Sequence, residues 1–362
     1  MRLIPKTIIF LIILYFLPDV FGCTVLTATN ENTTLVGNNE DMFHARSKVE
    51  FHSAADGKYG RVFFGMGRNL HQGGMNEKGL FFDCVATGPP EKVLPKTKPD
   101  CPGGLLDKIL EDCATIPEVI KLFDKYDSTY MNSYMTMIVD ASGDWFVSQA
   151  GIIDRKKEMT AAIGRGWQTA YRRLQKAPEI SVELFRSIVS EVHVEGVVKT
   201  LYSNVYDLKN QIIYLYYYYD FENPLRIDLH DYLKKNGTCS FYLGDLFPER
   251  DAQVKKNFQI VSQRLWKSAV AKDTIKFDRY VGTYIGQGID IDITQEDERY
   301  EIRFLGTEPY ELVPLSASIF TVVDTSGSDS RIKFVKEGLL TGRFKLEADL
   351  DGWKFTADRK SK

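Results

Sequence analysis

The 362-residue sequence predicts an α+β protein with two unlike domains behind a leader segment. Three observations lead to this expectation. An apolar run lies within residues 1–22, and amphipathic helices alternate with strand-like segments over residues 23–250. Short strand-like segments without an intervening helix fill residues 273–362, which is typical of a small all-β barrel or sandwich. Residues 251–272 form the connection between these two domains.

The composition excludes several classes of protein. The chain is 44% hydrophobic and 26% charged, as globular proteins are. Its 46 Lys and Arg residues against 49 Asp and Glu residues give a formal charge of −3. Because this balance leaves no basic surplus for a phosphate backbone, we do not expect a nucleic acid partner. The histidines show no spacing typical of metal ligands, and we expect neither a metal nor another cofactor.

Residues 1–22 are typical of a secretory signal peptide. Arg2 and Lys6 flank the start of the apolar run Thr7–Leu17, which is shorter than the roughly 20 residues of a membrane-spanning helix. No later segment is long and apolar enough to span a membrane. We therefore expect the leader to be removed and the protein to be secreted or periplasmic. Export also permits disulfides, with pairing left open, among Cys84, Cys101, Cys113 and Cys239.

Cleavage after Gly22 would make Cys23 the first residue of the mature chain. An N-terminal cysteine carries a thiol and an α-amine whose ordinary pKa is about 7.7–8.0, so the amine can accept the thiol proton. Two alternatives are an ordinary or disulfide-bonded cysteine and a lipoprotein anchor, since residues 20–23 loosely resemble a lipobox. Phe21 fits that motif poorly, and lipidation would normally acylate the amine that a nucleophile needs.

The segments after Cys23 predict a mixed α and β domain. Residues 25–28 and 34–36 read as two strands of a hairpin that opens the mature chain. Apolar residues at three-to-four spacing predict helices, and Thr115 with Glu118 forms a capping box. The expected helices cover residues 105–113, the segment after Thr115, and residues 181–192. The aromatic run Tyr214–Tyr219 is expected to be a strand with alternate rings in the core and in a substrate groove.

Residues 273–362 are expected to form strands only. Apolar residues alternate within several segments, and turn residues separate the segments. The expected strands cover residues 280–285, 289–294, 300–304, 310–313, 319–323, 332–335, 344–348 and 353–357. A helix over residues 254–266 is expected to precede them. We expect residues 271–362 to fold alone and their deletion to spare the chemistry of the first domain.

Four motifs follow Cys23 in order. They are Gly37–Asp41, Gly73–Leu80, Asn132–Gly143 and Thr200–Asp207. From Cys23 to about Phe247 the chain resembles the linear-amide C–N hydrolases, the group of N-terminal-nucleophile hydrolases that contains penicillin V acylases and bile salt (choloylglycine) hydrolases. The later strands resemble the lipocalin-like β domains appended to exported hydrolases, through residues 280–284 and 311–315.

The resemblance implies a four-layer αββα sandwich with Cys23 at the open end of its inner sheets. It places the family's nucleophile on Cys23 and the aspartate that holds the α-amine and thiol on Asp41. The implied reaction is hydrolysis of a non-peptide amide in a small N-acyl compound, through an acyl-enzyme on the thiol.

The sequence also departs from the family. Asn38 stands where the family has an arginine, so a neutral amide replaces a charge that could lower the thiol pKa. The family's oxyanion-stabilising Asn positions are not matched, and backbone amides could serve instead. Arg165 is a candidate for the family arginine that precedes the first long helix. Arg165 and Asn76 are therefore our candidate substrate-binding residues, beside the catalytic candidates Cys23, Asp41 and Asn38.

Two other functions fit the same features. One is an exported binding protein that keeps the fold but has little or no activity, with or without a lipid anchor at Cys23. The other is an acyltransferase, in which an amine intercepts the same acyl-enzyme. The particular acyl amide and the oligomeric state are left open by the sequence.

Overall fold

The computed structural model describes residues 22–66, 70–87, 95–131, 133–149, 152–155, 158–270, 275–286, 289–296, 299–304, 307–326, 329–337 and 343–360. The predicted leader therefore lies outside the described residues, except for Gly22. Within the described part of the chain, no helix is long and apolar enough to cross a membrane.

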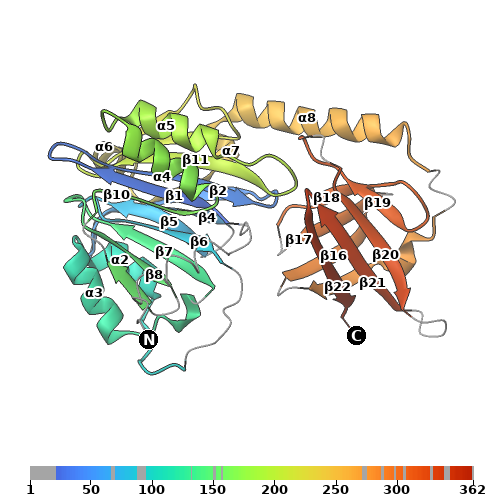
Figure 1. Ribbon diagram of the computed structural model, residues 1–362, viewed down its shortest axis with the longest axis horizontal. Coiled ribbons are helices and arrows are strands. Elements are labelled where there is room, and N and C mark those ends of the chain that lie inside the picture. Colours follow the sequence, from blue (N-terminus) through green and yellow to red (C-terminus); the bar gives the residue numbers. More distant parts are fainter. Residues whose placement is uncertain are drawn as a thin grey trace, which may run out of the picture.

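Two antiparallel sheets form the first part of the molecule (Figure 1). The six-stranded sheet has the order β10 (Thr160–Gly164), β1 (Thr24–Thr29), β2 (Thr34–Met42), β11 (Lys199–Asp207), β12 (Ile212–Tyr217) and β13 (Leu225–Asp228). The eight-stranded sheet has the order β14 (Cys239–Tyr242), β3 (Ser47–His52), β4 (Arg61–Met66), β5 (Leu70–Asn76), β6 (Phe81–Ala86), β7 (Tyr134–Val139), β8 (Trp145–Gln149) and β9 (Ile152–Arg155).

Helices cover the outer faces of both sheets. Helices α4 (Trp167–Lys176) and α5 (Val182–Glu191) share an apolar core with β1 and β2. Helices α2 (Leu105–Asp112) and α3 (Ile116–Lys125) share another with the eight-stranded sheet. A third core fills the space between the two sheets. The order of layers is therefore α, β, β, α, and the four-layer sandwich that the resemblance implied is confirmed.

Local sequence signals explain where these helices begin. The Glu118 carboxylate accepts a hydrogen bond from the Thr115 backbone N–H (3.1 Å), as the capping box predicts. At the start of α5, the Ser181 hydroxyl oxygen accepts a hydrogen bond from the Leu184 N–H (3.2 Å). The predicted helices over residues 105–113 and 181–192 are confirmed to within one residue at each end.

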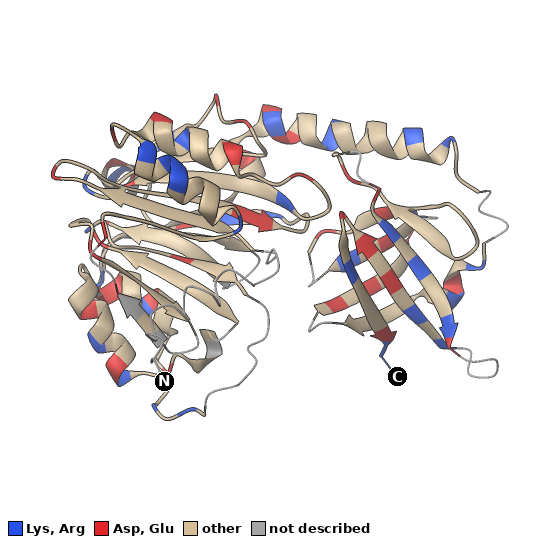
Figure 2. Cartoon of the chain, in the orientation of Figure 1, with Lys and Arg blue, Asp and Glu red and all other residues tan. Residues whose placement is uncertain are grey.

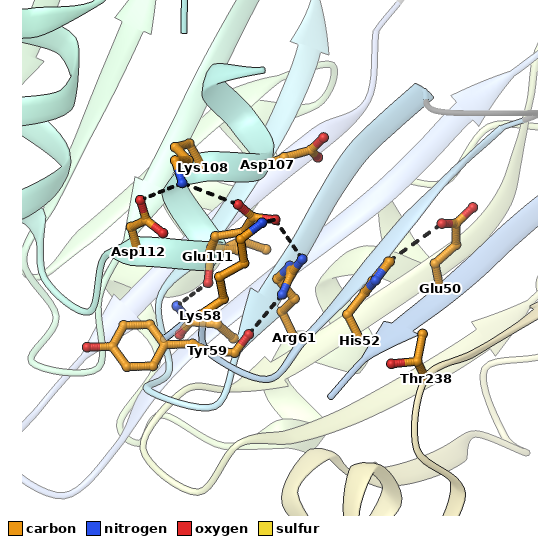
Figure 3. Close-up of polar contacts among 12 residues, drawn as sticks. Glu50, His52, Lys58, Tyr59, Arg61, Asp107, Lys108, Glu111, Asp112 and Thr238 are labelled. Atoms are coloured by element: carbon orange, nitrogen blue, oxygen red, sulfur yellow. Dashed lines mark hydrogen bonds and ion pairs between the residues drawn. The ribbon is translucent and has the colours of Figure 1, made fainter. Parts of the chain in front are cut away.

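A polar cluster fastens α2 to the start of β4 in the eight-stranded sheet (Figure 3). Glu111 of α2 accepts from the Arg61 guanidinium (2.7 Å) and from Lys58 Nζ (2.8 Å). Lys108 lies 2.9 Å from Asp112 and 3.6 Å from Glu111. Each charge in this cluster faces an opposite charge, which assigns the cluster to holding the helix in place.

The remaining helices of the described residues are α6 (Leu229–Asn236), α7 (Leu243–Leu246) and α8 (Pro248–Trp266). Two 3₁₀ turns cover Thr129–Met131 and Phe277–Tyr280. The long helix α8 leads from the two-sheet part to the C-terminal part (Figure 1). It contains the helix predicted over residues 254–266 and begins six residues earlier, at Pro248.

The C-terminal part is a closed antiparallel barrel. Its strands are β15 (Gly282–Gly286), β16 (Ile289–Glu296), β17 (Arg299–Phe304), β18 (Tyr310–Pro314), β19 (Ile319–Val322), β20 (Arg331–Glu337), β21 (Arg343–Leu350) and β22 (Trp353–Arg359). Pairing of β15 with β22 closes it, so the predicted all-β region is a barrel rather than a sandwich. Basic and acidic residues are interspersed along its strands (Figure 2), while aromatic rings fill its interior.

The barrel core also includes residues from the two-sheet part. Phe43, which follows β2, and Val197, which precedes β11, both belong to the barrel's apolar cluster. The Tyr310 hydroxyl donates to the Val197 carbonyl, and the Glu308 N–H donates to the His44 carbonyl (3.0 Å). The apolar core of the barrel therefore extends beyond residues 271–362, and the independent folding expected of that segment stays a prediction.

Candidate active site

Cys23 lies between the two sheets, directly before β1. Its side chain is 4% exposed and belongs to the inter-sheet core. Its carbonyl accepts a hydrogen bond from the Arg165 N–H (3.2 Å). A Cβ on Gly164 would lie 1.9 Å from that carbonyl oxygen, and Gly164 has φ +84°, so only glycine fits there. The end of β10 thus fixes the backbone of the candidate nucleophile.

The register of the β1–β2 hairpin determines what faces Cys23. Thr24 pairs with Asn39 and Val25 pairs with Asn38. Continued by one residue, this register places Cys23 opposite Glu40. Glu40 is fully buried; burial raises the pKa of its carboxyl to about 8, and the neighbouring Cys23 side chain lowers it. Sequence reasoning missed Glu40, although counting the hairpin register back from its turn would have found it.

Two side chains of the eight-stranded sheet meet Glu40 from the other side. Gln72 Nε2 of β5 donates to Glu40 Oε1 (2.5 Å). Asp83 of β6 is also buried. Its negative charge adds to the effect of burial in raising the pKa of the Cys23 thiol. A Cβ on Gly73 would lie 2.4 Å from Asp83 Oδ2, so the glycine makes room for this carboxyl. The thiol and carboxyls therefore converge from both sheets.

Asp41 lies close to the thiol. Burial is the main cause that raises the thiol pKa, the charge of the Asp41 carboxylate raises it further, and the Asp41 N–H lowers it. Its carboxylate accepts from Thr200 Oγ1 (2.6 Å) on β11. Burial raises the pKa of Asp41 to about 7, opposed by the Thr200 hydrogen bond and the charges of Arg165 and His193.

Burial and negative charge dominate the electrostatics of this cluster. Burial raises the pKa of the Cys23 thiol well above its ordinary value, and the carboxylates of Glu40, Asp41 and Asp83 raise it further. Burial likewise raises the pKa of Glu40 to about 8 and that of Asp83 well above the usual carboxyl range. With residue 22 still attached, the thiol is therefore protonated near neutral pH.

Asn38 and Arg165 both lie at the edges of this cluster. Asn38 is 1% exposed and two residues from Glu40 on the same strand, so their side chains share one face of β2. Its Oδ1 has no hydrogen-bond partner among the described residues. Arg165 is half-buried in the turn before α4, where its charge lowers the pKa of Asp41. Arg165 therefore provides a positive charge beside Asp41, whereas Asn38 is neutral at the position where the resemblance implied an arginine.

Asn76 has a structural role that differs from the predicted one. Its Nδ2 donates to the carbonyls of Leu110 (3.0 Å) and Cys113 (2.8 Å). Its Oδ1 accepts from the N–H groups of Lys78 and Leu80, both at 3.0 Å. These contacts occupy every donor and acceptor of the amide, so Asn76 ties the β5–β6 turn to α2. No polar atom of this side chain is left for a substrate.

The other cysteines are free thiols in this structure. Cys84 and Cys113 lie in the core under α2 and α3, on the opposite face of the sheet from Asp83. Cys101 and Cys239 are half-buried and separate. The disulfides that export would permit are therefore not formed here.

The aromatic run at residues 214–219 differs from the prediction at its end. Strand β12 stops at Tyr217, and Tyr218 and Tyr219 adopt φ +46° and +66°, a conformation that is strained for residues with a side chain. Arg250 Nε of α8 donates to the Tyr218 carbonyl (3.0 Å) and holds this turn. The turn directs the Tyr219 ring onto His193, with ring centroids 5.0 Å apart.

Comparisons with known proteins give distant matches only. No family model matches the chain, and no curated protein matches it. Among solved structures, it is similar to penicillin V acylase from Agrobacterium tumefaciens, with 15% identity, a TM-score of 0.43, and coverage of 57% of this chain and 86% of that one.

It is also similar to a variant of conjugated bile acid hydrolase from Clostridium perfringens, with 16% identity, a TM-score of 0.43, and coverage of 61% of this chain and 97% of that one. A second mutant of the same hydrolase gives 16% identity, a TM-score of 0.41, and coverage of 60% and 96%.

Proposed function

We propose that this protein hydrolyses a non-peptide amide C–N bond in a small N-acyl compound, with Cys23 as the nucleophile. The observation that carries the proposal is the position of Cys23, a buried thiol directly before β1, between the two sheets and opposite Glu40 in the continued hairpin register. An N-terminal cysteine placed there has its own α-amine as the base that nucleophilic catalysis requires. The motifs that follow Cys23 in the sequence favour the same reaction.

The proposed reaction begins with removal of residues 1–22, which frees the α-amine of Cys23. The thiol gives up its proton and its sulfur attacks the amide carbonyl. Collapse of the tetrahedral intermediate expels the amine and leaves a thioester on Cys23. Water then attacks the thioester, and the acid leaves. Asp41, fixed by Thr200, orients the amine and stabilises the ammonium form of it.

The proposed reaction takes a small N-acyl amide and calls for no cofactor. Removal of the leader by the export route would place the protein in the secreted or periplasmic compartment. Arg165, at the turn beside Asp41, is the candidate to bind a polar group of the substrate.

The experiment has two parts. Intact mass and N-terminal sequencing of the exported protein should show a chain that starts at an unmodified Cys23. Incubation with phenoxyacetyl and fatty-acyl amides should then release amine and give an acyl adduct on Cys23. Cys23→Ala should abolish both, while the matched control Cys239→Ala, in edge strand β14, should retain them.

Two results would contradict the proposal. One is a diacylglyceryl group on Cys23, which would identify a lipid anchor. The other is the lack of an acyl adduct across the whole substrate panel, which would favour a binding protein with this fold.

A further inference from the structure

The segment between α5 and β11 reaches from the candidate site into the barrel. Its ends are joined by two hydrogen bonds, from the Thr200 N–H to the Val194 carbonyl and from the Val194 N–H to Thr200 Oγ1, both at 2.8 Å. Val197, at the middle of the segment, is fully buried and belongs to the apolar core of the barrel. Residues 194–200 therefore form a loop with its base at Thr200 and its tip inside the barrel.

The base of the 194–200 loop holds Asp41. Thr200 Oγ1 accepts from the Val194 N–H, which leaves its single proton for Asp41 Oδ1 at 2.6 Å. Thr200 also pairs with Asp41 across β11 and β2, and the register of the two strands shifts between Thr200 and Tyr202. Such an irregularity fixes the direction in which a side chain leaves its strand. The position of the Asp41 carboxylate therefore depends on how the loop is held.

One hydroxyl of the barrel holds both strands beyond the Asp41–Thr200 pair. Tyr310, the first residue of β18, is 1% exposed. Its hydroxyl donates to the Val197 carbonyl, three residues before Thr200. The same hydroxyl accepts from the His44 N–H (2.6 Å), three residues after Asp41. Tyr310 thus ties the end of β2 to the loop that leads into β11.

We propose that Tyr310 is a positioning residue of the active site, whose hydroxyl fixes the Asp41–Thr200 pair from the barrel. This inference rests on the proposed function, in which Asp41 orients the α-amine of Cys23. It makes the barrel part of the catalytic unit, because a barrel side chain then determines where a carboxylate of the two-sheet part lies.

Loss of the Tyr310 hydroxyl would reach Asp41 through the backbone. It would leave the buried Val197 carbonyl and the part-buried His44 N–H without their partner. Such groups are nearly always paired in folded proteins, so both segments should shift to regain hydrogen bonds. A shift of about 1 Å in a group that takes part in catalysis can lower a rate by as much as about 10²-fold. A displaced Asp41 would stabilise the ammonium form of the amine less, and the Cys23 thiol would lose its proton less readily.

The test measures the reactivity of Cys23 without substrate turnover. Full-length mature protein, prepared with Cys23 as its first residue, is alkylated with iodoacetamide near neutral pH. The rate is followed at the Cys23 peptide by mass spectrometry. The variants are Tyr310→Phe, Asp41→Asn and the two combined. The matched control is Tyr284→Phe, since Tyr284 is also fully buried in the barrel and its hydroxyl donates to a backbone carbonyl, that of Tyr280 (2.9 Å).

Tyr310→Phe should slow alkylation by about 10-fold, whereas Tyr284→Phe should stay within about twofold of wild type even if urea unfolding shows that both lose stability. In the Asp41→Asn background, Tyr310→Phe should change the rate no further, because residues that act through one another are not additive. With an N-acyl amide that wild type cleaves, kcat should fall with the alkylation rate while KM is unchanged.

A second variant tests the loop tip from a surface position. Asp351 is exposed, and its carboxylate accepts from the Val197 N–H (2.7 Å). Asp351→Gly removes this acceptor and suits the backbone there, which has φ +56°. It should slow alkylation in the same direction as Tyr310→Phe and by a smaller factor. This variant also keeps the test decisive if Tyr310→Phe does not fold.

Three results would overturn the inference. They are an unchanged alkylation rate in folded Tyr310→Phe or, where that variant does not fold, in Asp351→Gly, an equal slowing in Tyr284→Phe, and a full further slowing by Tyr310→Phe in the Asp41→Asn background. The last two would assign Tyr310 to general stability. If the expected coupling appears but wild type cleaves no N-acyl amide, the proposed function fails and the positioning of Asp41 by Tyr310 stands.

Discussion

The ring of Phe43 stacks on that of Phe304, with centroids 4.3 Å apart and planes at 14°. Phe43 directly follows β2, two residues after Asp41 and three after Glu40. The strand that carries the candidate site therefore ends inside the core of the barrel. This contact links the position of the barrel to the strand that faces Cys23.

Phe43→Ala should destabilise the protein. The side chain is 6% exposed, and removing a buried phenylalanine ring costs about 3–5 kcal/mol. Urea unfolding should show a lower midpoint, with most of the loss recovered in Phe43→Leu.

The contact of Phe43 with the barrel core favours a different outcome from the one expected from the sequence: deletion of residues 271–362 should slow alkylation of Cys23. A truncated protein that remains folded with unchanged reactivity would show that the barrel is independent of the site.

Asp41→Asn should reduce activity by about 10²-fold, the scale for a positioned partner in proton transfer. It should also change the pH dependence of stability. Burial raises the pKa of Asp41 from 3.8 to about 7, so the folded state with residue 22 attached binds more protons than the unfolded state between these values. Stability therefore falls as pH rises through this window.

The asparagine variant lacks this ionisation and should lose less stability between pH 5 and pH 8. Urea unfolding at both pH values measures the difference. Asp56→Asn is the matched control because Asp56 is exposed. An equal loss of stability in wild type and Asp41→Asn would contradict the assignment.

Asn38→Arg should shift the pH profile of Cys23 reactivity to lower values. A guanidinium on the same face of β2 as Glu40 would stabilise the thiolate by charge. The site is buried, so the larger side chain should also cost about 1–3 kcal/mol of stability. Asn38→Gln adds volume without charge and separates the two effects. An unchanged inflection in a folded Asn38→Arg protein would place position 38 too far from the sulfur.

Asn76→Ala should lower stability without changing substrate affinity. It leaves the buried N–H of Leu80 and the part-buried N–H of Lys78 without their acceptor, and a buried N–H without a partner costs about 1–3 kcal/mol. Denaturant unfolding should show this loss, while KM for the best N-acyl amide stays within twofold of wild type. A raised KM with unchanged stability would restore Asn76 as a substrate-binding residue.

Most helices and strands, and their order along the chain, could be predicted from local sequence patterns. Period-two alternation indicated several strands of the barrel, because alternate side chains must face one core. Three-to-four spacing and the Thr115 capping box gave the helices that cover the eight-stranded sheet. Cys23 before a hairpin, with Asp41 at its end, was visible because these residues belong to one short local unit.

The surroundings of the Cys23 thiol could not be predicted in this way, because they come from segments far apart in the sequence. Glu40 faces Cys23 through the hairpin register, and Gln72 and Asp83 reach the same point from the other sheet. The Asn76 amide donates a hydrogen bond to a backbone carbonyl of α2, more than thirty residues away in the sequence. Local patterns encode which face of a strand is buried. They do not encode which strand packs across from it, since that depends on how the two sheets and the barrel bury their apolar faces together.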